Sequence, residues 1–209
     1  MADFVEVVRN RRMTRAFSPT PVDPAVVDSL VDLASRAPSA GKTQGWHLVV
    51  LEGEQTQRFW DISLPVAKRA SFRWANLLDA PVLAFPLADA GAYTDRYSEP
   101  DKARTGLGDG PDVWPVPYWT IDTSMSVMTM LLAAQNAGLG ALFFGVFHNE
   151  AGLRTELGIP DDLELLGAIA LGHPLGQSLD DSSAGDTGSG RSSSRPRRTP
   201  DQIIHRNRW

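Results

Sequence analysis

Arginine is the residue type whose spacing in this sequence most clearly suggests chemistry. The segment RNRRMTRAF contains Arg9, Arg11, Arg12 and Arg15, and Arg11 and Arg15 would share one face if the segment were helical. Like charges at this spacing repel unless an anion binds between them. A planar guanidinium group suits a phosphate, because it donates paired hydrogen bonds. The cluster therefore indicates either a phosphate site or a solvated basic patch.

Arginine is also concentrated at the C-terminus. Residues 191–209 hold six arginines and one acidic residue, Asp201, although the formal net charge of the whole chain is −5. The remainder of the chain is therefore strongly acidic, which argues against nucleic acid as a main partner. The basic C-terminus could serve solubility or pair with the acidic body.

A second candidate site is the segment PSAGKTQGW, residues 38–46. Its small residues and glycines would let the backbone approach a flat ligand closely. Ser39, Thr43 and Gln44 add hydrogen-bond donors and acceptors. The alternative is an ordinary turn between a helix and a strand, with Trp46 packed in the core.

The residues that the sequence lacks narrow the chemistry further. There is no cysteine, which excludes disulfides, iron–sulfur clusters, thiol nucleophiles and Cys-based zinc sites. The four histidines have no metal-ligand spacing, so we expect no metal. Phosphate-loop, dinucleotide-binding and GxSxG motifs are missing, as is any close acid–base pair. An enzyme with this sequence would borrow its reactivity from an organic cofactor.

Hydrophobic periodicity predicts helices and strands that interleave. No apolar run approaches the roughly 20 residues of a membrane span, and the N-terminus has no signal-peptide core, so we expect a soluble cytoplasmic protein. Because two helices precede any strand, we expect a mixed sheet surrounded by helices. The expected helices are 4–8, 24–34, 54–79 with a break near Pro65, 120–138 and 149–158, and the expected strands are 46–52, 81–88, 141–147 and 163–174.

Two segments fall outside this pattern. Residues 89–117 are rich in Gly, Pro and acids, and a loop of that length indicates a functional lid or disorder. Residues 176–199 are of low complexity, rich in Ser and Gly, and cannot form a packed core. We therefore expect a main domain over residues 1–175, a flexible linker over 176–196 and a C-terminal extension over 197–209.

Four motifs in order resemble the nitroreductase superfamily of flavoenzymes. RRMTRAF is similar to that family's RRS-x-R-x-F element, and PSAGKTQGW to its PS-x-x-N-x-QPW element. GLGALFFGVF, followed by LGIP and AIALGHP, resembles its GLG … LGIP … LGYP region. RRTPDQIIHRNRW matches its closing R-x-P-x-x-(I/V)-x pattern. Together the matches span about residues 5–205.

The resemblance implies a three-layer α+β fold, with a mixed central sheet flanked by helices. It also implies an intertwined homodimer that holds FMN at the subunit interface, and a main domain whose FMN site the C-terminal extension completes. The implied FMN contacts are Arg11, Arg12, Met13, Arg15, Pro38, Ser39, Lys42, Phe143, Phe144, Gly145, Arg197 and Arg198.

Each implied contact has a role in the family pattern. The first arginine cluster would meet the phosphate and the ribityl chain. Met13 stands where the family usually has Ser, so only its backbone can serve. The backbone of Phe143, Phe144 and Gly145 would lie against the isoalloxazine ring and donate toward N5 or O4.

Other implied contacts come from the second motif and the tail. Ser39 would contact the flavin from the partner subunit. Lys42 replaces the usual Asn, and it would either stabilise negative charge at N1–O2 of the reduced flavin or point to solvent; Gly45 replaces Pro. Either Arg197 or Arg198 would close on the phosphate.

The implied reaction transfers electrons from NAD(P)H through flavin N5 to a nitroaromatic, a quinone or a similar small acceptor. The protein would supply position and electrostatics. The choice between NADH and NADPH stays open. One alternative is a non-catalytic flavin-binding or storage protein. Another is specialised flavin chemistry on the same fold, such as dehydrogenation, dehalogenation or flavin breakdown.

Overall fold

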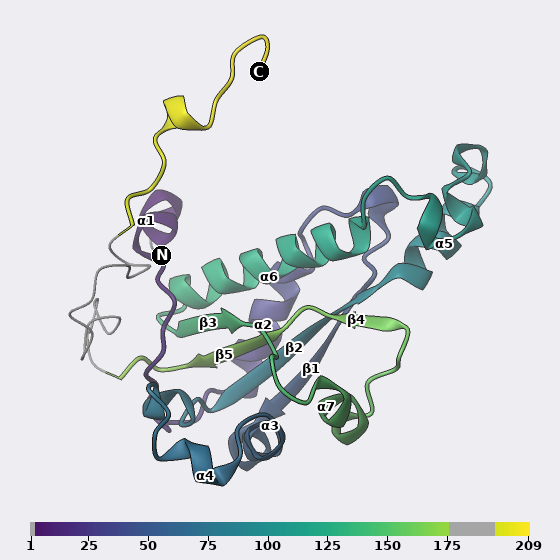
Figure 1. The fold of residues 1–209 in the computed structure, drawn as a ribbon. Helices are drawn as coiled ribbons and strands as arrows, with labels where there is room; N and C mark the ends of the chain where they lie inside the picture. The colour runs from purple at the N-terminus through teal and green to yellow at the C-terminus, as the bar shows by residue number, and fades with distance from the viewer. Residues whose placement is uncertain (1–2, 176–194) are drawn as a thin grey trace. The chain divides into compact units, whose positions relative to one another are not determined.

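The computed structural model describes residues 3–175 and 195–209. They belong to two units (Figure 1): a body that ends at Gly176, and a C-terminal unit from Gln177 to Trp209. Each is described by itself. The expected linker over residues 176–196 lies, up to residue 194, outside the described residues.

The centre of the body is one five-stranded sheet. Its main path has the order β1-β2-β5-β3, and β4 pairs with β2 beside that path. All the ladders between these strands are antiparallel. The strands are β1 (Trp46–Glu52), β2 (Val82–Asp89), β3 (Gly140–Phe144), β4 (Leu163–Leu165) and β5 (Ala168–Gly172).

Helices cover both faces of this sheet, which gives the three layers that the resemblance implies. Figure 1 shows α6 and α2 on one face, and α3 and α7 on the other. The helices are α1 (Phe4–Asn10), α2 (Pro24–Ala34), α3 (Thr56–Ser63), α4 (Val66–Arg69), α5 (Ala90–Ser98), α6 (Tyr118–Asn136) and α7 (Glu150–Leu157).

The central strands are apolar along their length because both of their faces are buried. In β2, Val82 and Ala84 pack toward α2 and α6, whereas Leu83 and Phe85 pack toward α3 and α7. This alternation follows the two-residue repeat of a strand. The core therefore consists of two clusters, one on each face of the sheet.

The expectation of a mixed sheet and of one strand over residues 163–174 needs correction. Among the described residues, the only parallel pairing is a single bridge between Met13 and Ala141, so the sheet is mixed only through that bridge. The expected strand is two strands, which separate at Gly167. This glycine has φ 144°, and a Cβ there would lie 2.6 Å from the Phe144 carbonyl oxygen, so only glycine fits this break.

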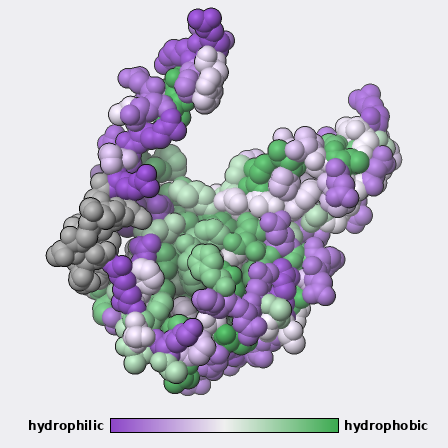
Figure 2. All heavy atoms as spheres, viewed as in Figure 1, coloured by the Kyte–Doolittle hydropathy of each residue, from purple (hydrophilic) through white to green (hydrophobic). Residues whose placement is uncertain are grey.

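Helix α6 carries a second apolar stripe in addition to its buried one. Its inner face packs on the sheet through residues such as Met130, which is 1% exposed. Its outer stripe consists of Tyr118, Ile121, Met125, Met128 and Leu132, spaced three and four residues apart. Ile121 is 41% exposed and Met128 is 42% exposed, so within one chain α6 is buried on one side and leaves an apolar stripe uncovered on the other. Figure 2 shows hydrophobic patches on the side of the body along which α6 runs.

Residues 11–17 form an extended N-terminal strap. Helix α1 ends at Asn10, and the strap is held by the Met13–Ala141 bridge and by a second bridge at Phe17. The expectation that Arg11 and Arg15 lie one helical turn apart is therefore wrong. The strap is extended because its main chain bonds to β3 and to Asn76 and not to itself.

Residues 89–117, termed the excursion, are not a structureless loop. They contain α5 and three short 3-10 turns. Trp114 packs edge-on against Tyr93 and Tyr97, with ring centroids 5.8 and 4.7 Å apart. Tyr93 is 1% exposed and Trp114 is 8% exposed. These aromatic side chains hold the excursion together.

The described part of the C-terminal unit has little regular structure. One 3-10 turn spans Pro200–Gln202 and begins with a capping box between Thr199 and Gln202. The rings of His205 and Trp209 stack with centroids 4.0 Å apart. Within residues 3–175 and 195–209, none of the helices has the length and apolarity that crossing a bilayer requires.

Candidate functional site

The N-terminal strap lies along β3. Met13 bridges Ala141, and the Thr14 N–H donates to the Ala141 carbonyl at 2.9 Å. Gly140 makes this approach possible, because a Cβ there would come within 2.6–2.8 Å of three atoms of Thr14. The structure thus brings the first arginine motif next to the strand that carries the third motif.

The strap arginines differ in their surroundings. Arg11 is partly buried at the end of α1. The Arg12 guanidinium donates to two main-chain carbonyls at the C-terminal end of α1, at 2.6 and 3.0 Å, where the helix dipole favours a cation. Arg15 donates to the Met13 carbonyl at 3.3 Å and lies 5.7 Å from the centre of the Trp74 ring. Among the described residues, no carboxylate pairs with Arg12 or Arg15.

At the end of β3, the side chains pack into the core, and the main chain is the part that could contact a ligand. The Phe144 ring stacks on Trp60 with an interplanar angle of 3°, and Phe143 packs against the core cluster on the other face. Gly145 follows, and a Cβ there would lie 2.7 Å from the Phe147 ring. Both phenylalanine rings are thus committed to packing, which agrees with a ligand contact through the main chain.

The second motif forms the Ser39 loop, residues 38–45. Gly41, Lys42 and Gln44 have φ values of 62°, 56° and 56°, in the left-handed region that side chains disfavour. The Ser39 hydroxyl oxygen accepts from the Gln44 N–H at 3.0 Å. Its own proton is therefore left to donate to another acceptor. Lys42 is exposed.

A buried carboxylate holds this loop from α6. Asp122, 5% exposed, accepts from the Ala40 N–H and from the Tyr93 hydroxyl, both at 2.7 Å. Burial, and then the hydrogen bond to Asp122, raise the pKa of Tyr93 far above its usual value, so the phenol stays a donor. The sequence motifs do not include Asp122. Its position nevertheless indicates a specific role, because it is the only charged residue in the otherwise uncharged segment YWTIDTSMSVMTMLLAAQN.

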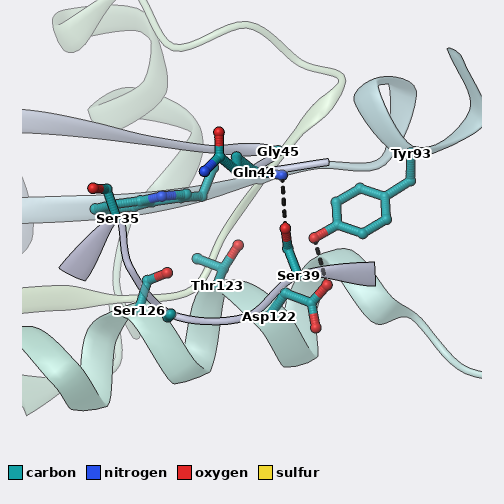
Figure 3. Close-up of a pocket in the computed structure, with 10 residues that line it drawn as sticks. Ser35, Ser39, Gln44, Gly45, Tyr93, Asp122, Thr123 and Ser126 are labelled. Carbon is teal, nitrogen blue, oxygen red and sulfur yellow. Dashed lines mark hydrogen bonds between the residues drawn. The ribbon is translucent and has the colours of Figure 1, made fainter. Parts of the chain in front are cut away.

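These groups enclose a cavity of about 10 Å³ (Figure 3), which is room for one water at most. Figure 3 shows Thr123 and Ser126 rising from α6 toward the loop. The Thr123 hydroxyl is buried and has no hydrogen-bond partner among the described residues. The cavity is lined by Ser35, Ala37, Ser39, Gln44, Gly45, Trp46, Tyr93, Asp122, Thr123 and Ser126.

A larger hollow of about 620 Å³ opens at the other end of β1. It could accept a cofactor by size, but its charged lining residues are Glu52, Glu54 and Asp79, with no arginine or lysine among those that line it. A phosphate would be repelled there. The arginine strap therefore remains the candidate anion site.

Within one chain, the strap and the Ser39 loop are not brought together. The loop leads into β1, whereas the strap lies on β3, and the order β1-β2-β5-β3 puts two strands between them. Three strand spacings amount to about 14 Å. Pro38 is exposed at the start of the loop, and Arg197 and Arg198 are exposed in the C-terminal unit.

Gly45 explains one departure from the family pattern. A Cβ at this position would lie 2.8 Å from the Tyr93 ring and 3.1 Å from the Asp89 carbonyl oxygen. We expect Gly45→Ala to lower the free energy of unfolding by about 1–3 kcal/mol, the usual cost of overpacking, measured by urea denaturation. Gly91→Ala on the exposed side of α5 is the control: its Cβ would meet only the Asp89 Oδ1, at 3.1 Å, and alanine favours the helix, so we expect a smaller change in the free energy of unfolding. Equal stability of the two variants would contradict this account of Gly45.

Comparison with known proteins gives consistent matches. The sequence model of the nitroreductase family matches residues 8–173. A protein of Archaeoglobus fulgidus, named provisionally as an NADH dehydrogenase/NAD(P)H nitroreductase, is 26% identical over 83% of this chain and 87% of its own length. The 5,6-dimethylbenzimidazole synthase of Rhodobacter capsulatus is 28% identical over 82% of this chain and 83% of its own length.

A solved structure matches in fold. The crystal structure of a protein of Exiguobacterium sibiricum, described provisionally as a nitroreductase and in complex with FMN, superposes with a TM-score of 0.68. The superposition covers 98% of this chain and 97% of that one, at 17% identity. The likeness extends over nearly the whole fold.

Proposed function

This chain belongs to the nitroreductase family, and from that membership we propose that it is an FMN-dependent oxidoreductase that passes electrons from NAD(P)H to a nitroaromatic, a quinone or a similar small acceptor. The observation that carries the proposal is the strap of arginines beside β3, within the part of the chain that matches the family. The provisional name of the archaeal relative, an NADH dehydrogenase/NAD(P)H nitroreductase, supports the nicotinamide as electron donor.

The residues fit FMN by their donor chemistry. A phosphate needs several charged donors, and Arg12 and Arg15 are not paired with carboxylates among the described residues. A flat ring can lie against main chain, and the end of β3 offers main chain because the Phe143 and Phe144 rings pack into the core. When bound, FMN supplies the redox chemistry, and this chain supplies binding and orientation.

In this proposal each motif has one task. Arg11, Arg12 and Arg15 bind the phosphate and the ribityl chain, with Met13 contributing backbone. The main chain of residues 143–145 lies along the isoalloxazine ring.

The second motif and the tail complete the proposed site. Ser39, whose proton is free to donate, and exposed Lys42 face the flavin, with Pro38 beside them. Arg197 or Arg198 closes on the phosphate, so the C-terminal unit works as an extension that completes the site.

We propose further that the protein is a homodimer with FMN between the subunits. Two features support this. The strap and the Ser39 loop lie at opposite edges of one sheet, so a second copy is needed to bring a loop to a strap. The outer stripe of α6 leaves Ile121 and Met128 exposed at helical spacing, as expected of a helix that packs on a partner.

Specialised flavin chemistry on the same fold is the second candidate. It is favoured by the similarity to 5,6-dimethylbenzimidazole synthase, whose name describes a different reaction at a comparable identity of 28%. The two candidates share the fold and the proposed anion site, and they differ in the reaction that the bound flavin would carry out.

Anaerobic reduction of the purified protein separates the two candidates. We expect the flavin to bleach on adding NADH or NADPH and to recover its colour on adding a nitroaromatic or a quinone. Bound flavin that neither nicotinamide bleaches would favour the second candidate. A protein that retains no FMN, even after incubation with it, would refute both.

A further inference from the structure

The Ser39 loop has a backbone that needs support from outside. Lys42 and Gln44 carry side chains at φ values of 56°, which is uncommon for residues other than glycine. Backbone of this kind persists where the surrounding structure fixes it, and it concentrates at functional sites. The elements that fix this loop therefore bear on its function.

Side chains from two helices bond to the main chain of two adjacent residues of the loop. The Asp122 carboxylate on α6 accepts from the Ala40 N–H at 2.7 Å. The Arg96 Nε on α5 donates to the Gly41 carbonyl at 2.9 Å. Tyr97, also on α5, packs against position 41 so closely that no side chain fits there, because a Cβ at Gly41 would lie 2.9 Å from the Tyr97 ring. The loop is thus fixed from both sides at its first turn.

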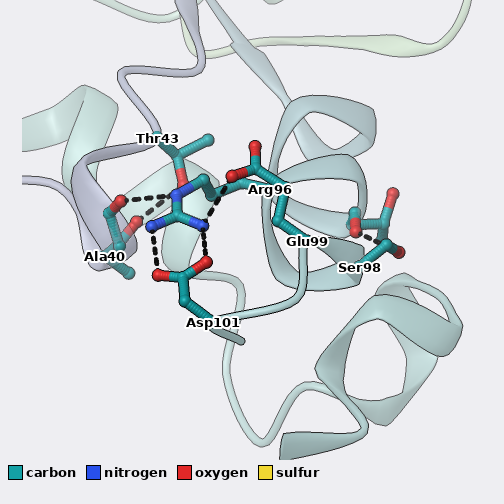
Figure 4. Close-up of polar contacts among 8 residues, drawn as sticks. Ala40, Thr43, Arg96, Ser98, Glu99 and Asp101 are labelled. Atoms are coloured by element: carbon teal, nitrogen blue, oxygen red, sulfur yellow. Dashed lines mark hydrogen bonds and ion pairs between the residues drawn. The ribbon is translucent and has the colours of Figure 1, made fainter. Parts of the chain in front are cut away.

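Arg96 is not available as an anion site, because its own charge is matched (Figure 4). It donates to Glu99 at 2.9 Å and to both carboxylate oxygens of Asp101 at 2.8 and 2.9 Å. The hydrogen bond from Arg96 is the largest cause of a lowered pKa at Asp101, so this pair stays ionised near neutral pH. The two carboxylates orient the guanidinium, and its Nε is aimed at the loop.

We infer that Arg96 and Asp122 are positioning residues for flavin binding, and that they act by holding the Ser39 loop in the conformation in which the Ser39 hydroxyl meets the flavin. The inference rests on the proposed function. It assigns to α5 and its carboxylates a part in cofactor binding, although Arg96 itself would touch no cofactor.

The test measures the dissociation constant of FMN by the change in flavin fluorescence on binding. Arg96→Ala is expected to raise this constant about tenfold. Arg154→Ala is the matched control, because Arg154 also donates to one carboxylate and to main-chain carbonyls, on α7. The two side chains are shielded alike, 23% and 18% exposed, and Arg154→Ala should leave the constant unchanged.

A double variant separates positioning from a general loss of stability. If Arg96 acts through Ser39, then Ser39→Ala in the Arg96→Ala background adds less than it does alone. Fully additive effects, or equal constants for Arg96→Ala and Arg154→Ala, would overturn the inference and leave the proposed function intact. If Arg96→Ala does not fold, Asp122→Ala, which removes the acceptor of the Ala40 N–H, carries the same expectation, and an unchanged constant there overturns it. A wild-type protein that binds no FMN overturns both proposals.

Discussion

The double variant Arg11→Ala/Arg15→Ala is expected to lose FMN on gel filtration and to raise its dissociation constant about 10²- to 10⁴-fold. A charge-assisted hydrogen bond contributes roughly 1.5–3 kcal/mol, so two of them account for a loss of this size. The fold should survive, because the strap is held by main-chain bonds from Thr14 and Phe17, which neither substitution removes. Fluorescence titration with FMN gives the constant directly.

The control for this variant carries the same change in charge. Arg36→Ala/Arg58→Ala removes two arginines that pair with carboxylates on the surface, and such pairs contribute little. It should bind FMN like the wild type. Similar dissociation constants for the two double variants would contradict the assignment of the strap as the phosphate site.

The second large effect is expected on α6. Ile121→Glu/Met128→Glu puts two carboxylates in the outer stripe, where burial without partners costs several kcal/mol. We expect a monomer in analytical ultracentrifugation and, because the site would then lack its second half, loss of FMN. Both side chains are more than a third exposed within one chain, so circular dichroism should still show a folded protein.

A matched variant tests whether added charge alone has this effect. Leu33→Glu/Val66→Glu replaces two exposed apolar residues outside α6, at 42% and 72% exposure, and it should leave both assembly and FMN binding unchanged. If the α6 variant stays dimeric, or if the wild type is itself a monomer that binds FMN, the proposed interface is wrong.

Local patterns in the sequence were enough to place the elements whose signals are strong. Strand β1 was expected over 46–52, where the structure has it. Helix α2 begins at Pro24, with Asp23 accepting from the Ala25 N–H, as an N-cap before proline predicts. The four motifs indicated the family because their residue types and their order can be recognised in the sequence alone.

The parts that the sequence did not predict depend on contacts between distant segments. The strap has no glycine or proline to end a helix between Asn10 and Phe17, and it is extended because it bonds to β3. The excursion is ordered by Trp114 packing on two tyrosines. Asp122 gains its role only when folding brings Ala40 to it across 82 positions.

The strap also has a thermodynamic consequence. It is fastened at its middle by the Thr14–Ala141 bond and at its end by Phe17, which is 0% exposed and donates its N–H to the Asn76 carbonyl at 3.0 Å. The main chain that carries Arg12 and Arg15 is therefore already ordered in the protein alone, so binding of the proposed phosphate would restrict only the side-chain rotations of these arginines. A smaller loss of conformational entropy would favour tighter binding for the same number of electrostatic contacts.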